Sequence, residues 1–431
     1  MLPTPVRRSA VIRFAARLPD STRRTLVAGA AAIALSGCGS ALESPPVTSN
    51  PEPSFPKTLA ISGRGTIVGR YSAEIAKRGD YAYTTTWGQR GNPQANGDAI
   101  YVWRVTGTPQ LVDSIIVPTL QVGVAIRNTG DVQVSDDGTL LVVPTELAPG
   151  SLEVYDLSNP ARPVSLARFT SPAITRGVHT AKLQRIGGRL YAFLSVNNAS
   201  SHPSRLMIVD LADPAHPVEV MHRDMGNPFI HDVFVRDGLL FTALWDDGLV
   251  LWDIGGGGKG GSLRDPVEIG RVIPKNGRTH NAWWFHDPST GSKRFVLVGE
   301  EGAATLFTSS SGDLHVIDIA NPAQPVEVAF LNIPGAGVHN FSMDEARGIL
   351  YAAWYNAGVQ AIDVTGDLSR CTILQKGEDG RCDLQLMGRV LASTPVDAAT
   401  PLFVWGVQFD GSWVYATDML GGLMRMAAVN R

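Results

Sequence analysis

The stretch FIHDVFVRDGLLFTALWDDGLVLWDI, from Phe229 to Ile254, contains three short apolar runs that are separated by Asp-Gly pairs. The runs are rich in Val, Leu, Phe and Trp, and Asp-Gly favours tight turns, so the stretch predicts three consecutive β-strands. One histidine, His231, stands at its beginning. Whether this pattern recurs decides both the fold and the meaning of the histidine.

The third run ends in an apolar-Asp-apolar triplet, and it recurs along the chain. Its five clear copies are LEVYDL (152–157), LMIVDL (206–211), LVLWDI (249–254), LHVIDI (314–319) and VQAIDV (359–364). Two degenerate copies are IYVWRV (100–105), in which Arg104 takes the Asp place, and LMRMAA (423–428). In three copies the chain continues as SNPARPV, ADPAHPV or ANPAQPV.

This pattern resembles the LVIVD repeat family of bacterial lipoproteins. Seven four-stranded units imply an all-β, seven-bladed β-propeller with antiparallel blades. One blade cannot bury both faces of its sheet, and a closed ring gives every blade a neighbour on each side. The 45 glycines and the low charged fraction of 18% also favour many short elements joined by tight turns.

Ring closure is expected at the two ends of the repeats. The last unit stops after its third strand, and GTIVGRYS (65–72) is similar to fourth-strand segments such as PVEIGRV (266–272). We therefore expect an N-terminal strand, residues 66–71, to lie antiparallel beside residues 422–428 and join the C-terminal blade.

The N-terminal region predicts export. Residues 1–37 combine six arginines with the apolar run TLVAGAAAIAL (25–35), which is too short to span a bilayer and is typical of a signal peptide. The sequence Leu35-Ser36-Gly37-Cys38 resembles a lipobox, which implies that Cys38 is lipidated and anchors the protein to the membrane of the bacterial cell envelope. STRRTLV (21–27) resembles a twin-arginine motif, so both export routes stay open.

Three segments follow from these patterns: a lipoprotein signal peptide (1–37), a disordered tether rich in Pro and Ser (38–56) and the propeller (57–431). The mature body is expected in the periplasm or outside the cell, as a monomer attached to the outer membrane or cell surface. Removal of the signal peptide leaves 31 basic and 39 acidic residues, and this acidic balance argues against nucleic acid as a partner.

The aspartates of the repeated triplets are predicted to be turn residues. Each stands where a strand enters a turn, and there a carboxylate can accept backbone N–H groups. These aspartates are Asp156, Asp210, Asp253, Asp318 and Asp363.

The two remaining cysteines, Cys371 and Cys382, bracket an insertion after the repeat that ends at 364. Because export leads to an oxidising compartment, they predict a disulfide that fastens this loop.

Four of the nine histidines occupy one position, the start of the inner strand in four consecutive units: His179, His231, His280 and His339. The other three units have Ser72, Asp131 and Val404 at about this place. The loops between second and third strands should lie on the same face of the ring, and they contribute acids, amides and tryptophans, including Asp246, Glu300 and Glu301.

Two interpretations of the histidines stay open. Duplication can repeat a histidine that only hydrogen-bonds neighbouring loops. Alternatively, His231, His280 and His339 bind a metal or a polar ligand, with Glu301 or Asp246 as a further ligand or partner and Arg278 nearby. All four histidines are not expected on one ion, because metal–nitrogen bonds are about 2 Å long. Imidazole with carboxylate suits Zn, Cu, Fe or Mn.

VHNFSMDEARGILYAAWYNAGVQAIDV (338–364) is also remotely similar to the selenium-binding protein and methanethiol oxidase family, whose propellers carry histidine-bound copper. The first expected function is a binding or scaffold module for an envelope protein, peptide or polysaccharide. The alternative is a metal-dependent oxidoreductase or hydrolase, and whether the protein is an enzyme stays open. GGGGKGG (255–261) lacks the Ser or Thr of a phosphate-binding loop, and no G-x-S-x-G elbow occurs.

Overall fold

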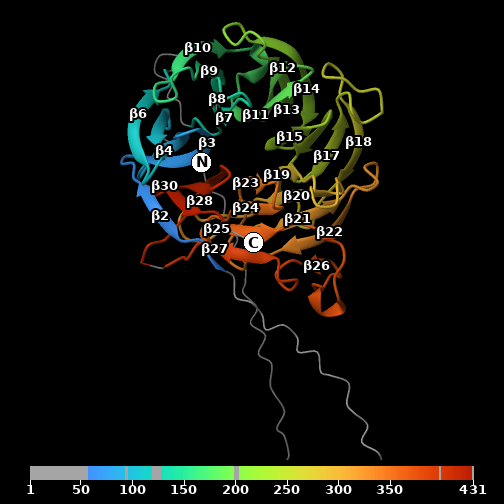
Figure 1. Cartoon of the computed structure of the whole chain (residues 1–431). Coiled ribbons are helices and arrows are strands. Elements are labelled where there is room, and N and C mark those ends of the chain that lie inside the picture. The colour runs from blue at the N-terminus through green and yellow to red at the C-terminus, as the bar shows by residue number, and fades with distance from the viewer. Residues whose placement is uncertain are drawn as a thin grey trace, which may run out of the picture. The chain divides into compact units, whose positions relative to one another are not determined.

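The computed structural model describes residues 57–92, 96–118, 128–146, 148–198, 203–397 and 399–429. The predicted signal peptide, the lipidated Cys38 and the tether lie outside these residues. The described part of the chain forms seven antiparallel four-stranded sheets in a ring, so the predicted propeller is confirmed (Figure 1). None of its helices is long and apolar enough to cross a membrane.

The sheets follow the chain in order. The first four blades are β3 (Arg70–Arg78), β4 (Tyr81–Gln89), β5 (Ala99–Arg104) and β6 (Gln110–Ile116); β7 (Gln133–Val134), β8 (Leu140–Pro144), β9 (Leu152–Asp156) and β10 (Val164–Phe169); β11 (Val178–Ile186), β12 (Arg189–Val196), β13 (Ser204–Asp210) and β14 (Val218–Gly226); and β15 (Asp232–Arg236), β16 (Leu239–Ala243), β17 (Leu249–Asp253) and β18 (Val267–Val272).

The last three blades include strands from outside the regular order. They are β19 (Thr279–Trp284), β20 (Phe295–Glu300), β21 (Leu314–Asp318) and β22 (Val326–Leu331), with β26 (Cys382–Asp383) added in parallel; β23 (Phe341–Asp344), β24 (Ile349–Ala353), β25 (Val359–Asp363) and β27 (Val390–Ser393), with β1 (Lys57–Thr58) added in parallel; and β28 (Val404–Phe409), β29 (Trp413–Asp418), β30 (Gly422–Ala427) and β2 (Ile61–Gly65).

Apolar side chains between the blades form the core. Leu249 and Leu251 of β17 are fully buried and pack with Val296 and Val298 of β20, which belong to the next blade. The continuous apolar runs of the sequence are thus strands buried on both faces, as a ring of stacked sheets requires.

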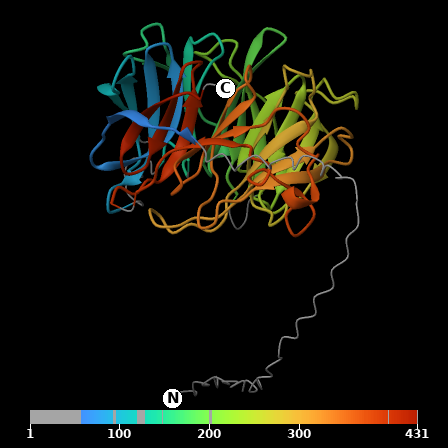
Figure 2. The same ribbon diagram turned by 60° about the horizontal axis from the view of Figure 1, so that its bottom comes forward.

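The N-terminal strand closes the ring, as predicted, but through a different segment. β2 pairs antiparallel with β30, with Ile61 opposite Met426 and Gly65 opposite Leu423. Figures 1 and 2 both show the blue start of the chain beside the red last blade.

The prediction that residues 66–71 would supply this strand is wrong, because the innermost strand of blade 1 begins at Arg70. A glycine marks the strand that does close the ring. A Cβ atom at Gly65 would lie 2.4 Å from the ring of Trp103, so only glycine lets the backbone pass.

The repeated aspartates have the predicted role in the turns. In each of the five, Oδ1 accepts the backbone N–H two residues further on, at 2.8 or 2.9 Å. Asp253 also accepts the N–H groups of Gly257, Lys259 and Gly261, so the glycine-rich segment wraps around this carboxylate. The predicted disulfide between Cys371 and Cys382 is present.

Candidate functional site

The four aligned histidines lie together at the inner side of blades 3 to 6. His179 belongs to β11 and His280 to β19, whereas His231 and His339 stand just before β15 and β23. Their rings form a continuous arc, with centroids 4.2 Å apart for His179 and His231, 3.8 Å for His231 and His280, and 4.2 Å for His280 and His339. The alignment of the repeats therefore predicted a real cluster.

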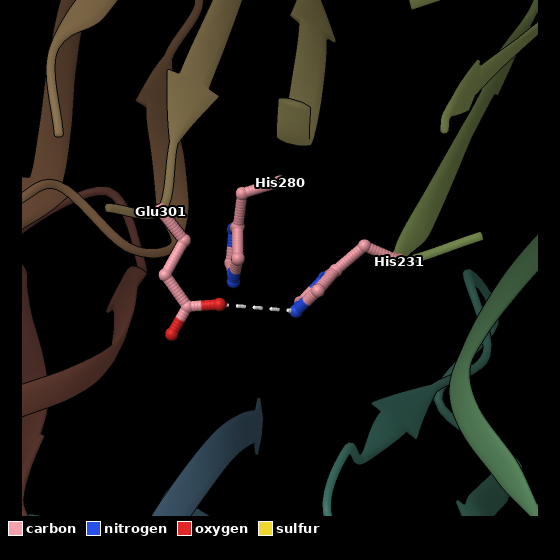
Figure 3. A group of neighbouring side chains, drawn as sticks. All are labelled: His231, His280 and Glu301. Carbon is pink, nitrogen blue, oxygen red and sulfur yellow. Dashed lines mark ion pairs between the residues drawn. The ribbon is translucent and has the colours of Figure 1, made fainter. Parts of the chain in front are cut away.

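Glu301 joins this arc from the loop that follows β20. Its Oε2 lies 3.5 Å from Nε2 of His231, and the ligand atoms of His231, His280 and Glu301 all lie within 4.8 Å of one another (Figure 3). The Tyr355 hydroxyl donates a hydrogen bond to Oε1 of Glu301. One carboxylate oxygen is thus anchored, and the other faces the imidazoles.

His339, the third histidine of the expected ligand set, is oriented by other groups. Its Nδ1 donates to the carbonyl oxygen of Trp405 at 2.9 Å and lies 3.6 Å from Oε1 of Glu74. The structure therefore groups Glu301, in place of His339, with His231 and His280.

His280 is the most unusual side chain of the cluster. It is 1% exposed, and neither ring nitrogen has a hydrogen-bond partner among the described residues. A neutral imidazole carries one N–H donor and one lone pair. Each buried and unmet polar group costs about 1 to 3 kcal/mol, so this arrangement calls for a physical reason.

His179 is held by a carboxylate. Glu146 lies 2.9 Å from Nδ1 of His179 and accepts a second hydrogen bond, 2.8 Å long, from Asn128. Burial opposes a charge on His179, but Glu146 outweighs it and raises the pKa of the imidazole. Nε2 of His179 lies 2.9 Å from Nε2 of His231, so the two rings share one proton between facing nitrogens.

The remaining imidazoles are neutral at pH 7. Burial, and then the neighbouring imidazoles, lower the pKa values of His231 and His280 well below the ordinary value, and burial lowers the pKa of His339 to about 4. Burial alone would raise the pKa of Glu301, but the attraction of His280 and His339 in their protonated forms, together with the hydrogen bond from Tyr355, outweighs burial and lowers that pKa. The cluster thus offers neutral nitrogens and an ionised carboxylate.

A cavity of about 460 Å³ adjoins the arc along the inner strands. Glu74, Asp131 and Asp232 line it, together with Lys182 and with the aromatic side chains of Trp87, Phe229 and Trp405. Burial and then Asp131 raise the pKa of Glu74 well above its ordinary range, and burial and then Asp131 raise the pKa of Asp232 to about 7.

Two other predicted residues stand apart from the cluster. The side chains of Asp246 and Arg278 are exposed and do not line the cavity. The backbone carbonyl of Arg278, however, accepts the N–H of Glu301 at 3.0 Å and so helps to place that carboxylate.

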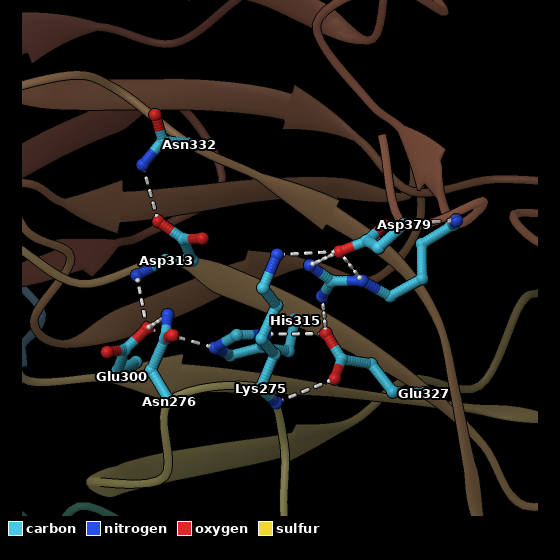
Figure 4. A network of polar contacts seen from close by, with 9 residues as sticks. Lys275, Asn276, Glu300, Asp313, His315, Glu327, Asn332 and Asp379 are labelled. Carbon is cyan, nitrogen blue, oxygen red and sulfur yellow. Dashed lines mark hydrogen bonds and ion pairs between the residues drawn. The ribbon is translucent and has the colours of Figure 1, made fainter. Parts of the chain in front are cut away.

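Glu300 does not line the cavity and belongs to a separate polar network (Figure 4). Its Oε2 lies 3.3 Å from Nε2 of His315, whose Nδ1 lies 2.7 Å from Oε1 of Glu327. Glu327 also accepts from Arg381 of the disulfide-bonded loop. Glu300 and Glu301 therefore serve different regions, as adjacent strand residues with opposite orientations should.

Sequence reasoning missed a second polar layer in the cavity. A polar residue directly follows each histidine of the arc, and all four line the cavity: Thr180, Asp232, Asn281 and Asn340. This recurrence was visible in the aligned repeats. Glu74, Lys182 and Tyr355 gave no such signal, because their units differ from the others at these positions.

The repeat matches a known family model in two places. The model of the LVIVD repeat matches residues 191–224 and 308–332, which include strands of blades 3 and 5. Two segments of the chain thus match the LVIVD repeat. No curated protein sequence matches the chain.

Solved structures confirm the architecture of this LVIVD-repeat propeller. The C-terminal WD40 domain of Sif2 has a TM-score of 0.54 and 11% identity, over 88% of this chain and 100% of that one. The computationally designed Ika8 protein has a TM-score of 0.50 and 10% identity, over 86% and 100%. At such low identity the likeness shows the fold alone.

Proposed function

We propose that this LVIVD-repeat propeller binds one divalent transition-metal ion at the cell envelope, on His231, His280 and Glu301. The observation that carries the proposal is the buried imidazole of His280, neither of whose nitrogens has a protein partner among the described residues. A metal bond would use the nitrogen lone pair that burial otherwise leaves unmet.

The spacing of the ligand atoms supports this assignment. On a tetrahedral ion with bonds of about 2.1 Å, neighbouring ligand atoms lie roughly 3.4 Å apart. Nε2 of His231 and Oε2 of Glu301 are 3.5 Å apart, and small side-chain rotations bring the His280 ligand atom, which lies within 4.8 Å of both, to the same ion. Tyr355 orients the carboxylate, as partners of metal ligands commonly do.

The protonation states also favour a metal. Ligands must be deprotonated, and the lowered pKa values keep both imidazoles neutral and Glu301 ionised at pH 7. Nε2 of His231 cannot serve both His179 and an ion, so metal binding competes with this contact. Zn, Cu, Fe and Mn suit such ligands. A bound ion supplies Lewis acidity, and Cu or Fe adds electron transfer.

The wider role is a binding module, which the repeat architecture supports. An envelope protein, peptide or polysaccharide on the same face is the alternative occupant. The metal-dependent oxidoreductase or hydrolase deepens the metal proposal, since the ligands adjoin a cavity that can admit a small molecule.

The envelope location is proposed from the lipobox-like residues Leu35 to Cys38. Cys38→Ser should move the protein from the membrane fraction to the soluble fraction after cell lysis. An unchanged distribution would contradict lipidation at this residue.

The metal proposal is tested by stoichiometry. Purified protein is freed of metal, incubated separately with Zn, Cu, Fe or Mn, passed through a desalting column and analysed for bound metal. We expect about one equivalent of at least one ion, and its loss in Glu301→Gln and His280→Leu. His222→Ala, which changes an exposed histidine outside the channel, serves as the control. The proposal would be refuted if wild-type protein bound less than one equivalent of each of the four metals. It would also be refuted if the two site variants bound as much metal as wild type.

A further inference from the structure

The cavity beside the proposed metal site has more acidic than basic side chains in its lining. Of its described lining residues, one has an ammonium group, Lys182, and five have carboxyl groups: Glu74, Asp131, Glu146, Asp232 and Glu301. Glu146 is matched by His179, and Glu301 belongs to the proposed metal site. Glu74, Asp131 and Asp232 share the single ammonium of Lys182, and burial raises the pKa of all three, so a cation that enters this part of the cavity favours their ionised forms.

Glu74 is the acid whose hydrogen-bonding capacity is most clearly unused. It is 8% exposed, it lines the cavity, and its Oε1 accepts no hydrogen bond among the described residues. Gly406 makes room for it, because a Cβ atom there would lie 2.7 Å from Oε2 of Glu74. A buried carboxylate oxygen without a donor is stabilised by a ligand that brings an N–H group and a positive charge.

Lys182 shows how the channel accommodates an ammonium group. Its Nζ lies 5.7 Å from the ring centroids of both Phe234 and Trp283, within cation–π range. Its charge also lowers the pKa values of Asp131 and Asp232 relative to what burial alone would give. Aromatic faces and carboxylates together thus hold a primary amine that belongs to the protein.

The size and the walls of the cavity point to an organic cation. About 460 Å³ exceeds the space that a single metal ion occupies and falls within the range of small-molecule sites. Trp87, Phe229 and Trp405 are among its lining residues, so apolar and aromatic surface is available for a carbon chain.

We propose that this cavity binds a small protonated amine, with its ammonium group at Glu74 and its carbon chain against the aromatic lining residues. The inference rests on the proposed function in one respect: two of the proposed metal ligands, His231 and Glu301, line the cavity, and a bound ion there would make the amine a candidate substrate. Amine binding itself depends on the carboxylates and the aromatic rings, not on the ion.

The experiment compares three probes of equal length by isothermal titration calorimetry: n-pentylamine, 1-pentanol and pentanoate. Each is titrated into metal-free and into metal-loaded full-length protein. We expect the amine to bind at least about 10-fold more tightly than the alcohol, and pentanoate to show no binding. Glu74→Gln should remove this preference, whereas Asp246→Asn, which neutralises an exposed acid outside the cavity, should keep it.

Asp131→Asn provides a second variant if Glu74→Gln does not fold, and thermal unfolding checks both. Equal affinity for amine and alcohol in folded wild-type protein would overturn the proposal, as would unchanged preference in both variants. Ca²⁺ provides a further check. If Ca²⁺ displaces the amine completely and still binds to the Glu74→Gln variant, the carboxylates belong to an inorganic-ion site instead. Amine selectivity without metal uptake would refute the metal site alone, and metal uptake without amine selectivity would refute the amine site alone.

Discussion

Blade 5 contains two buried histidines, His280 and His315, in opposite surroundings. His315 on β21 is 0% exposed, and each of its ring nitrogens lies within 3.3 Å of a carboxylate oxygen, from Glu327 or Glu300. His280 on β19 is 1% exposed, and neither of its nitrogens has a partner among the described residues. Buried polar groups are nearly always paired, so the first histidine is a structural residue and the second is a candidate ligand.

One short backbone segment serves both regions. Glu300 turns outward to His315, and Glu301 turns inward to His231. The outer network is completed by the protein itself, through Arg381 and Asp379 of the disulfide-bonded loop (Figure 4). The inner cluster, which Figure 3 shows, has no such completing groups for His280 among the described residues, and His231 and Glu301 line a cavity. Burial alone therefore does not distinguish a structural histidine from a candidate ligand, but the number of polar partners of its ring nitrogens does.

The largest expected effect is on metal affinity. His280→Leu removes one ligand and should weaken metal binding by about 1,000-fold, equivalent to about 4 kcal/mol. The unfolding free energy of the metal-free protein should not fall, because the lost imidazole makes no hydrogen bond and leucine fills a similar volume. Competition with a chromophoric chelator measures the affinity, and urea unfolding measures the stability. Unchanged affinity would remove the distinction between the two histidines.

The matched change in the outer network should lower the stability and leave metal binding unchanged, which is the opposite of the result expected for His280→Leu. His315→Leu leaves Glu300 and Glu327 partly buried without their imidazole partner, which should lower the unfolding free energy by about 3 kcal/mol. Metal stoichiometry and affinity should stay at the wild-type values. A stable variant with impaired metal binding would show that the inner and outer regions are coupled.

Repeats made the fold and the histidine arc predictable from the sequence. The triplet ending in Asp recurs at strand–turn junctions, and the histidines recur at one point of the inner strand, so alignment alone placed both. The chemistry of the site was less accessible. Glu74, Lys182 and Tyr355 occur in single units, and only the closed ring brings their blades to a common cavity or cluster.

The closing strand was misplaced for a related reason. The phrases ISGRG (61–65) and IVGRY (67–71) are similar, and either could serve as a fourth strand. What selects the first is the contact of Gly65 with Trp103 and the need for the second to lead into β3. Both are tertiary constraints that no local pattern contains.

Removal of the disulfide tests how far the outer network depends on its loop. Cys371→Ser combined with Cys382→Ser should lower the unfolding free energy by about 2 kcal/mol, because the bond closes a short loop. The loop holds Arg381 against Glu327, so the loss should diminish when His315→Leu is already present. A double-mutant cycle of urea unfolding measures this coupling. Full additivity would mean that the loop and His315 are independent.

The smallest expected effect is the share of one histidine, His280, in the pH dependence of the metal-free protein. The unfolded chain binds protons at its histidines below about pH 6.5, but His231, His280 and His339 stay neutral in the folded state because their pKa values are lowered, that of His339 to about 4. Stability should therefore fall as pH decreases below about 6.5, by up to about 1.4 kcal/mol per pH unit for each such histidine.

His179 has the opposite sign, because its pKa is raised and its contribution is lost only as pH rises through the folded value. Urea unfolding between pH 6 and pH 5 gives the unfolding free energy as a function of pH. Its slope should be shallower for His280→Leu than for wild type, because the variant takes up one proton fewer on unfolding. Equal slopes would show that His280 is protonated in the folded protein.

The pairing of β2 with β30 also sets an order in time. β2 precedes the other six blades in the chain and its partner β30 follows them, so blade 7 cannot be completed until the ribosome has made β30. Before that point β2 has no partner strand, whereas the intervening blades can already stack on one another. The ring therefore closes only when its last blade is complete, and the cavity beside the histidine arc is fully enclosed only at that step.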